Sequence, residues 1–235
     1  MCKNILFLIP YAVVNSSIYN ELENELNKKL VNTEIIKVEL KGHGQRKNEE
    51  LYDSIDQASN EIINFIRRKQ KGSKVYIYGH CLGAIIAYDI YSKVKEDKIF
   101  NIEKLFLGSV SMNSKKFNFD EFVDNYIKSN IEKLLNNEDI KISNEIIKQA
   151  LKYSTPILYK EYRIIVEYLS SKKVTFDENI ILINGKLDIW FDIDIIKNCV
   201  NGYEFSKQYF TSGGHFYLDT CCNELADILL SEIDD

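Results

Sequence analysis

The chain has 235 residues, of which 45% are hydrophobic and 28% charged, and its formal net charge at pH 7 is −5. This length suits one large domain with a substantial core. The acidic balance argues against a nucleic-acid partner and gives no electrostatic reason for membrane binding. The apolar run at residues 5–9 is too short for a signal-peptide core or a membrane-spanning helix, so we expect no membrane partner.

The five cysteines are odd in number and do not have the spacing of a disulfide framework. There is no C-x-x-C motif and no Cys/His cluster that would bind zinc, so we expect neither a metal nor a cofactor. A reducing cytoplasm is the simplest compartment for such a chain. We therefore expect a cytoplasmic protein, and we also expect it to be a monomer.

The first part of the chain alternates between predicted strands and predicted helices. Residues 5–9 form a continuous apolar strand that ends at Pro10, as in strands buried on both faces of a parallel sheet. A helix capped by Ser16 or Ser17 follows, then a strand at residues 34–40. An apolar stripe at helical spacing predicts the next helix from residue 51 to residue 66.

Residues 75–88 pass from a β-forming stretch, through a glycine-flanked turn, into an apolar run that suits a packed helix. The central residue of the turn is Cys81, with Gly79 and Gly83 on either side. A nucleophile between two such glycines, placed between a strand and a helix, is the nucleophile-elbow pattern of α/β-hydrolases. We expect that side chains at 79 and 83 would collide with the adjoining strand and helix. A buried cysteine in a tight turn is the alternative.

Later segments extend the alternation, with strands predicted at residues 104–110, 179–184 and 203–210 and a closing helix that contains Leu225. Together these segments predict an α/β fold with a mostly parallel sheet and helices on both faces. The block at about residues 112–173 lacks glycine and has helical apolar spacing. We interpret it as a helical insertion into a single domain that spans residues 1–235.

Three polar residues follow separate predicted strands, in the order Cys81, Asp188 and His215. Reactive groups gather where parallel strands end, and nucleophile, acid, base is the chain order of the α/β-hydrolase triad. We predict that His215 accepts the thiol proton of Cys81 while Asp188 orients the imidazole. Taken singly, Asp188 could be a turn residue and His215 a solvated loop residue. The other two histidines, His43 and His80, are interpreted as packing groups.

A tetrahedral intermediate at Cys81 would need preformed N–H donors for its oxyanion. One predicted donor is the backbone N–H of Leu82, at the start of the elbow helix. The other would come from Tyr11 or Ala12, in the loop after the first strand.

Five segments carry a resemblance to a known family: Phe7-Leu8-Ile9-Pro10-Tyr11-Ala12, Leu40-Lys41-Gly42-His43-Gly44-Gln45-Arg46, Tyr78-Gly79-His80-Cys81-Leu82-Gly83-Ala84, Gly185-Lys186-Leu187-Asp188 and Gly213-Gly214-His215-Phe216-Tyr217-Leu218. Together they resemble the type II thioesterases, free-standing α/β-hydrolases that serve nonribosomal peptide and polyketide synthases. The resemblance covers nearly the whole chain. It implies hydrolysis of acyl groups from the phosphopantetheine arm of an acyl or peptidyl carrier protein, and a helical lid at about residues 112–173.

The chain departs from that family in three places. Cys81 stands where serine is usual, Val13-Val14 replace two glycines, and Lys41 replaces a proline. Two alternatives to hydrolysis therefore stay open. One is an acyltransferase or cyclase that passes the acyl group from Cys81 to an amine or hydroxyl. The other is an inactive module that docks on a synthase, and the presence of both Asp188 and His215 argues against it.

Overall fold

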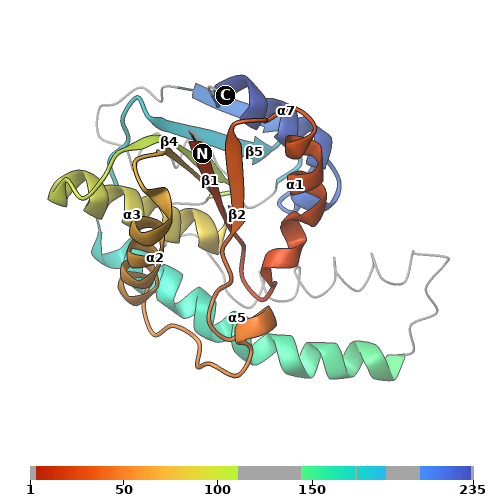
Figure 1. Cartoon of the computed structure of the whole chain (residues 1–235). Coiled ribbons are helices and arrows are strands. Elements are labelled where there is room, and N and C mark those ends of the chain that lie inside the picture. The colour runs from red at the N-terminus through yellow and green to blue at the C-terminus, as the bar shows by residue number, and fades with distance from the viewer. Residues whose placement is uncertain (1–3, 111–143, 173, 189–206, 234–235) are drawn as a thin grey trace.

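The computed structural model describes residues 4–110, 144–172, 174–188 and 207–233. It contains a six-stranded sheet with the strand order β2-β1-β3-β4-β5-β6 (Figure 1). The strands are β1 (Asn4–Ile9), β2 (Thr33–Lys37), β3 (Lys74–His80), β4 (Ile102–Gly108), β5 (Ile180–Gly185) and β6 (Lys207–Thr211). Every adjacent pair is parallel. This confirms the predicted α/β fold with a mostly parallel sheet.

Helices cover both faces of the sheet. On one face lie α2 (Ile55–Gln70) and α3 (Leu82–Asp97), and on the other lie α1 (Asn20–Asn27) and α7 (Cys222–Glu232). Successive residues of β1 alternate between the two cores, so that Phe7 packs with α2 and α3 while Leu6 packs with α1 and α7. All of β1 and β5 is buried, as expected for strands covered on both sides.

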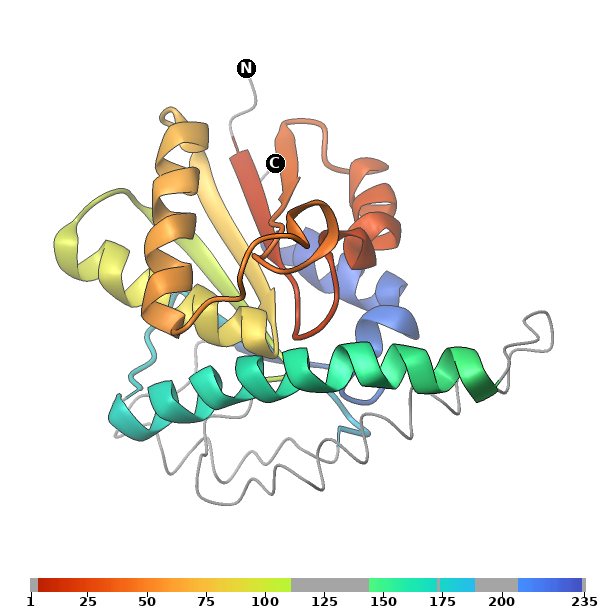
Figure 2. The same cartoon turned by 90° about the horizontal axis from the view of Figure 1, so that it is seen from below.

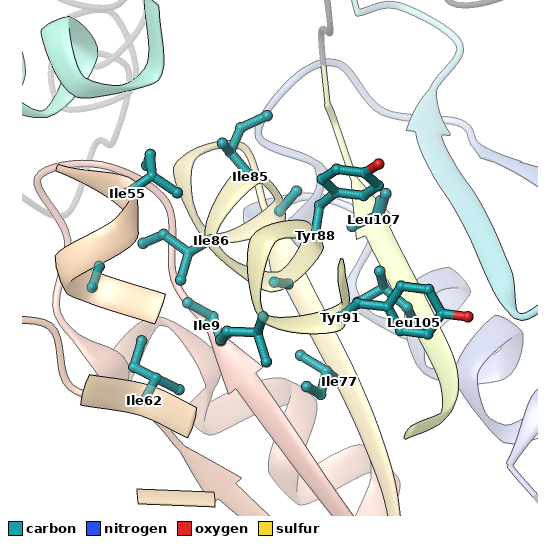
Figure 3. Packing of buried hydrophobic residues seen from close by; sticks show 14 of the residues in the cluster. Ile9, Ile55, Ile62, Ile77, Ile85, Ile86, Tyr88, Tyr91, Leu105 and Leu107 are labelled. Carbon is teal, nitrogen blue, oxygen red and sulfur yellow. The ribbon is translucent and has the colours of Figure 1, made fainter. Parts of the chain in front are cut away.

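The packing of α3 against the sheet fixes where its N-terminus lies. Figure 3 shows Ile86 of α3 beside Ile55 of the neighbouring helix α2, and Tyr91 of α3 beside the strand residue Leu105. Burial of one such side chain stabilises the fold by about 2 kcal/mol. The first turn of α3 is therefore held firmly against the carboxyl end of β3.

The predicted helical insertion is described only in its second half. Residues 144–171 form the long helix α5 (Asn144–Ser171), which runs along one end of the sheet in Figures 1 and 2. Residues 111–143 of the predicted insertion lie outside the described part of the chain. The described portion is helical and adds no strand to the sheet.

Several predicted boundaries differ from the structure. The second helix begins at Ile55 and not at residue 51, because the Ser54 side chain caps it by accepting from the Gln57 N–H. The first helix begins with a 3₁₀ turn, Ser16–Tyr19, and its cap is Asn15, whose side-chain oxygen accepts from the Ser17 N–H, rather than Ser16 or Ser17. The second strand ends at Lys37 and not at residue 40, because β1 ends at Ile9 and offers no partner beyond the bond from Val38 N to Leu8 O. The described part of the last strand begins at Lys207, and residues 203–206 are outside the described ranges.

Candidate active site

Cys81 lies in a sharp turn between β3 and α3. Its backbone has φ 51° and ψ −109°, a conformation that non-glycine residues rarely adopt. Its N–H donates to Gly108 O at 2.8 Å, and its carbonyl accepts from the N–H groups of Ala84 and Ile85 in the first turn of α3. These bonds hold the strained residue in place at the N-terminus of the helix.

The two glycines of the elbow are sterically required, as the sequence predicted. A Cβ atom at Gly79 would lie 2.1 Å from the carbonyl oxygen of Gly83, on the adjoining helix. A Cβ atom at Gly83 would lie 2.1 Å from the carbonyl oxygen of Ile9, on the neighbouring strand. Because neither residue has a Cβ atom, α3 can approach both β3 and β1 closely.

Asp188 and His215 lie together in the loops that follow β5 and β6. Nδ1 of His215 is 2.9 Å from Oδ2 of Asp188, and the two side chains are only 7% and 1% exposed. The loops themselves are joined by a hydrogen bond from Leu187 N to Gly213 O at 3.0 Å. A Cβ atom at Gly185 would lie 2.3 Å from that same Gly213 oxygen, so this glycine permits the close contact.

The surroundings of His215 favour its protonated form. Burial alone would lower the pKa of the imidazole, but its interactions with the side chains of Asp188 and Cys81 outweigh burial and raise the pKa well above its usual value of 6.5. Nδ1 is bound to Asp188. Nε2 is therefore the nitrogen left to exchange a proton with the thiol.

The predicted oxyanion donors belong to two segments that the structure brings together. Leu82 is the first residue of α3, and Tyr11 and Ala12 are buried in the loop directly after β1. The close approach of Gly83 to the carbonyl oxygens of Ile9 and Pro10 brings that loop next to the start of α3.

His80 is not merely a packing group in the elbow. It is fully buried, and its Nε2 lies 2.8 Å from the backbone carbonyl oxygen of His215, which also accepts from Ser109 Oγ at 2.9 Å. Its Nδ1 lies 2.9 Å from the hydroxyl of Tyr78. Burial, together with the charge of His215, lowers the pKa of His80 to about 3, so the imidazole is neutral and Nε2–H donates to the carbonyl.

Sequence reasoning missed the role of Glu161 on α5, which no motif marks. Oε1 of Glu161 lies 2.6 Å from Nε2 of His43, and both side chains are at most 5% exposed. The only sequence signal was that His43 stands between two glycines in a predicted loop, where its partner could not be identified.

Within the described ranges there is no group of three His, Cys, Asp or Glu side chains that could hold a metal ion. The helices described there include none that is long and apolar enough to cross a membrane. The described cysteines 81, 221 and 222 are free thiols, and cysteines 2 and 199 lie outside the described residues.

The family of this chain is shown by a match to a family model. Residues 4–234 match the model of the thioesterase domain. The chain belongs to the thioesterase family. Membership supports a hydrolase that acts on thioesters.

Solved structures of other proteins, one of them a thioesterase by name, share the fold at low sequence identity. A thioesterase named RedJ, from the prodiginine pathway of Streptomyces coelicolor, aligns with a TM-score of 0.77 at 17% identity, over 99% of this chain and 86% of its own. ClbQ, from the colibactin NRPS/PKS pathway, aligns with a TM-score of 0.70 at 16% identity, over 98% and 96% of the two chains. A lipase-esterase related protein from Clostridium acetobutylicum aligns at 0.67 and 20% identity, over 98% and 95%. No curated protein matches this thioesterase domain.

Proposed function

We propose that this protein hydrolyses acyl thioesters on the phosphopantetheine arm of an acyl or peptidyl carrier protein, with Cys81 as nucleophile. The observation that carries the proposal is the buried His215–Asp188 pair, 2.9 Å apart, beside a strained Cys81 in a thioesterase domain. The carrier-protein substrate is supported by the resemblance to type II thioesterases and by relatives from prodiginine and colibactin pathways.

In the first half-reaction the Cys81 thiolate attacks the carbonyl carbon of the thioester, and the carbonyl oxygen takes the displaced electron pair. The N–H groups of Leu82 and of Tyr11 or Ala12 would stabilise this oxyanion. Collapse of the intermediate breaks the bond to the phosphopantetheine sulfur. His215 gives its proton to that departing sulfur, a role supported by its raised pKa.

In the second half-reaction water hydrolyses the acyl-Cys81 intermediate. Neutral His215 takes a proton from water as the water oxygen attacks the acyl carbon. Collapse expels the Cys81 thiolate and releases a carboxylic acid, which leaves His215 protonated for the next cycle. Asp188 stabilises the imidazolium and keeps Nδ1 from taking part.

We further propose that α5 belongs to a lid, at about residues 112–173, on one hydrolase domain. Tyr162 on α5 supports this arrangement: burial raises the pKa of its hydroxyl, and an electrostatic interaction with Cys81 raises it further. An aromatic residue in that position would contact the acyl chain.

Acyl transfer is a second candidate, and the thiol nucleophile favours it. An acyl-Cys81 intermediate is itself a thioester, so loading is nearly thermoneutral and the intermediate keeps enough activation to acylate an amine. In that reaction a neutral amine attacks the acyl carbon in place of water. Its nitrogen gives a proton to His215 as the C–N bond forms, and collapse expels the Cys81 thiolate.

The test is incubation with acyl-loaded carrier proteins, followed by intact mass spectrometry of both proteins. We expect loss of the acyl mass from the carrier, free acid in solution and a transient acyl adduct on the enzyme that is absent in Cys81→Ala. Cys221→Ala is the matched control, because Cys221 is a free thiol outside the proposed triad. A folded wild-type protein that releases no acyl group from any carrier or small thioester would overturn the proposal.

A further inference from the structure

Val13, in the loop that carries the proposed oxyanion donors Tyr11 and Ala12, has an unfavourable backbone conformation. Its φ is +72°, in the left-handed region. A β-branched residue rarely occupies that region, because its Cβ substituents crowd the backbone. Something in the surrounding structure must therefore hold Val13 in place.

The group that holds Val13 is a carboxylate of α5. Oε2 of Glu161 accepts a hydrogen bond from the backbone N–H of Val13 at 2.8 Å, a contact between residues 148 positions apart in the sequence. The Glu161 side chain is about 5% exposed, so this charge-assisted bond is shielded from water.

The carboxylate is itself fixed by a second contact. Its other oxygen, Oε1, lies 2.6 Å from Nε2 of His43, in the loop that follows β2. With the carboxylate ionised, the imidazole nitrogen is the donor. Glu161 thus bridges two loops at the carboxyl edge of the sheet, and neighbouring helix residues Leu158 and Ile164 are packed into the core.

We propose that Glu161 is a positioning residue for the oxyanion hole: by holding the Val13 N–H, it keeps the strained loop in the shape that presents the Tyr11 and Ala12 N–H groups to the reacting carbonyl. This inference rests on the proposed thioesterase function. It implies that the helix over the site and the oxyanion loop move as one unit. A displacement of α5 that breaks the bond to Val13 relaxes the loop and weakens transition-state stabilisation.

The kinetic test compares wild type with Glu161→Ala and Glu161→Gln on one small acyl thioester. Loss of an oxyanion donor costs about 100-fold or more in kcat. Glu161→Ala should lower kcat by about 10- to 100-fold, with KM changed less than about threefold, because the defect appears in the transition state. Glu161→Gln keeps an oxygen for the Val13 N–H and should retain most of the activity. Glu167→Ala, at an exposed position of the same helix, is the control.

A second substitution separates positioning from general packing. Glycine adopts positive φ at little steric cost, so Val13→Gly removes the strain that Glu161 must oppose. The loss caused by Glu161→Ala should therefore be at least about fivefold smaller in the Val13→Gly background. An equal loss in both backgrounds, or no loss of kcat in Glu161→Ala, would overturn the inference. If Glu161→Ala does not fold, the same comparison is made with Glu161→Leu in both backgrounds, with Glu167→Leu as control.

Hydrogen exchange gives a readout that needs no substrate. The Val13 amide should exchange at least about tenfold faster in Glu161→Ala than in wild type or Glu167→Ala, since the carboxylate that accepts its hydrogen bond is gone. Unchanged exchange would overturn the inference even if turnover fell. A wild-type protein that cleaves no thioester would instead overturn the proposed function, while the exchange rate would still decide whether Glu161 holds the loop.

Discussion

His80 and His215 are joined by a hydrogen bond of 2.8 Å, from Nε2 of His80 to the backbone carbonyl oxygen of His215. His80, which directly precedes the proposed nucleophile Cys81, therefore anchors the backbone of His215, the proposed base. This bond needs a neutral His80 that donates from Nε2 and accepts at Nδ1 from Tyr78. The environment enforces that state by lowering the pKa of His80 to about 3.

We expect this buried histidine to make the fold less stable in acid. The unfolded chain binds a proton at His80 below about pH 6.5, whereas the folded protein does not until about pH 3. Unfolded protein therefore holds more protons in this window, and the free energy of unfolding should fall as the pH falls, by up to about 1.4 kcal/mol per pH unit from this group. Urea unfolding of wild type and His80→Gln from pH 7 to pH 4 measures how steeply the free energy of unfolding changes with pH in each protein. Parallel slopes would show that His80 titrates normally.

Substitutions at the proposed base should be more severe than those at its partner. His215→Ala removes the group that moves the proton in both half-reactions, and we expect kcat/KM to fall at least about 1,000-fold. Asp188→Asn should cost less, because a thiol ionises more readily than a serine hydroxyl. Steady-state kinetics on a small acyl thioester measures both. If either His43→Ala or His80→Ala were as damaging as His215→Ala, the assignment of the base would be wrong.

Cys81→Ser should change the product distribution as well as the rate. An acyl-serine is an oxygen ester, which lies lower in energy than a thioester, and thioesters favour amines over water more than oxygen esters do. With one acyl thioester and a competing amine, wild type should form more amide relative to free acid than Cys81→Ser does. Chromatography of the two products measures the ratio. An identical ratio would leave hydrolysis as the sole proposed reaction.

Gly83→Ala should destabilise the fold strongly because its Cβ would lie 2.1 Å from the Ile9 carbonyl oxygen and force α3 away from β1. A loss of about 3 kcal/mol or more in unfolding free energy is expected from such overpacking against backbone. Gly72→Ala is the comparison: no atom lies within 4 Å of its Cβ, and only its φ of +86° opposes the change, at a cost of about 1 kcal/mol. Similar losses in denaturant unfolding would contradict the steric explanation.

Tyr162→Ala should alter the preference for acyl chain length, because this half-buried aromatic residue of α5 interacts electrostatically with Cys81. We expect the ratio of kcat/KM for long and short acyl thioesters to change severalfold, while turnover of an acetyl thioester stays within about threefold. Tyr153→Ala, on the same helix but 63% exposed, serves as the control. Equal losses on every chain length would indicate damage to the catalytic centre and not to acyl selection.

The elbow could be predicted from sequence because its rules are local. Gly79, Cys81 and Gly83 fall within five residues, and their spacing reflects the steric needs of one turn. The proximity of Asp188 and His215 was predicted for a different reason: parallel strands place their carboxyl ends at one edge, so strand ends could be combined without knowing any contact. The catalytic roles of these residues stay predictions.

The supporting contacts could not be predicted in the same way. Glu161 meets His43 across 118 positions, and His80 meets the His215 carbonyl across 135. Neither pair has a spacing rule, and a glutamate on a long helix has the same local pattern whether it faces water or a buried imidazole. The left-handed φ of Val13 was hidden as well, because a β-branched residue normally argues against such a conformation.

The strand order places the nucleophile after an inner strand and His215, one of its two proposed activators, after an edge strand. Cys81 follows β3, a strand flanked by β1 and β4, whereas Asp188 and His215 follow β5 and β6, and β6 is the outermost strand on its side of the described sheet. Outer strands open more easily than inner ones. Fraying of β6 under mild denaturant would detach the acid–base pair while the elbow stays folded. Turnover would then vanish before the far-ultraviolet circular dichroism changes, and enzyme activity would serve as a reporter of local opening at one side of the sheet.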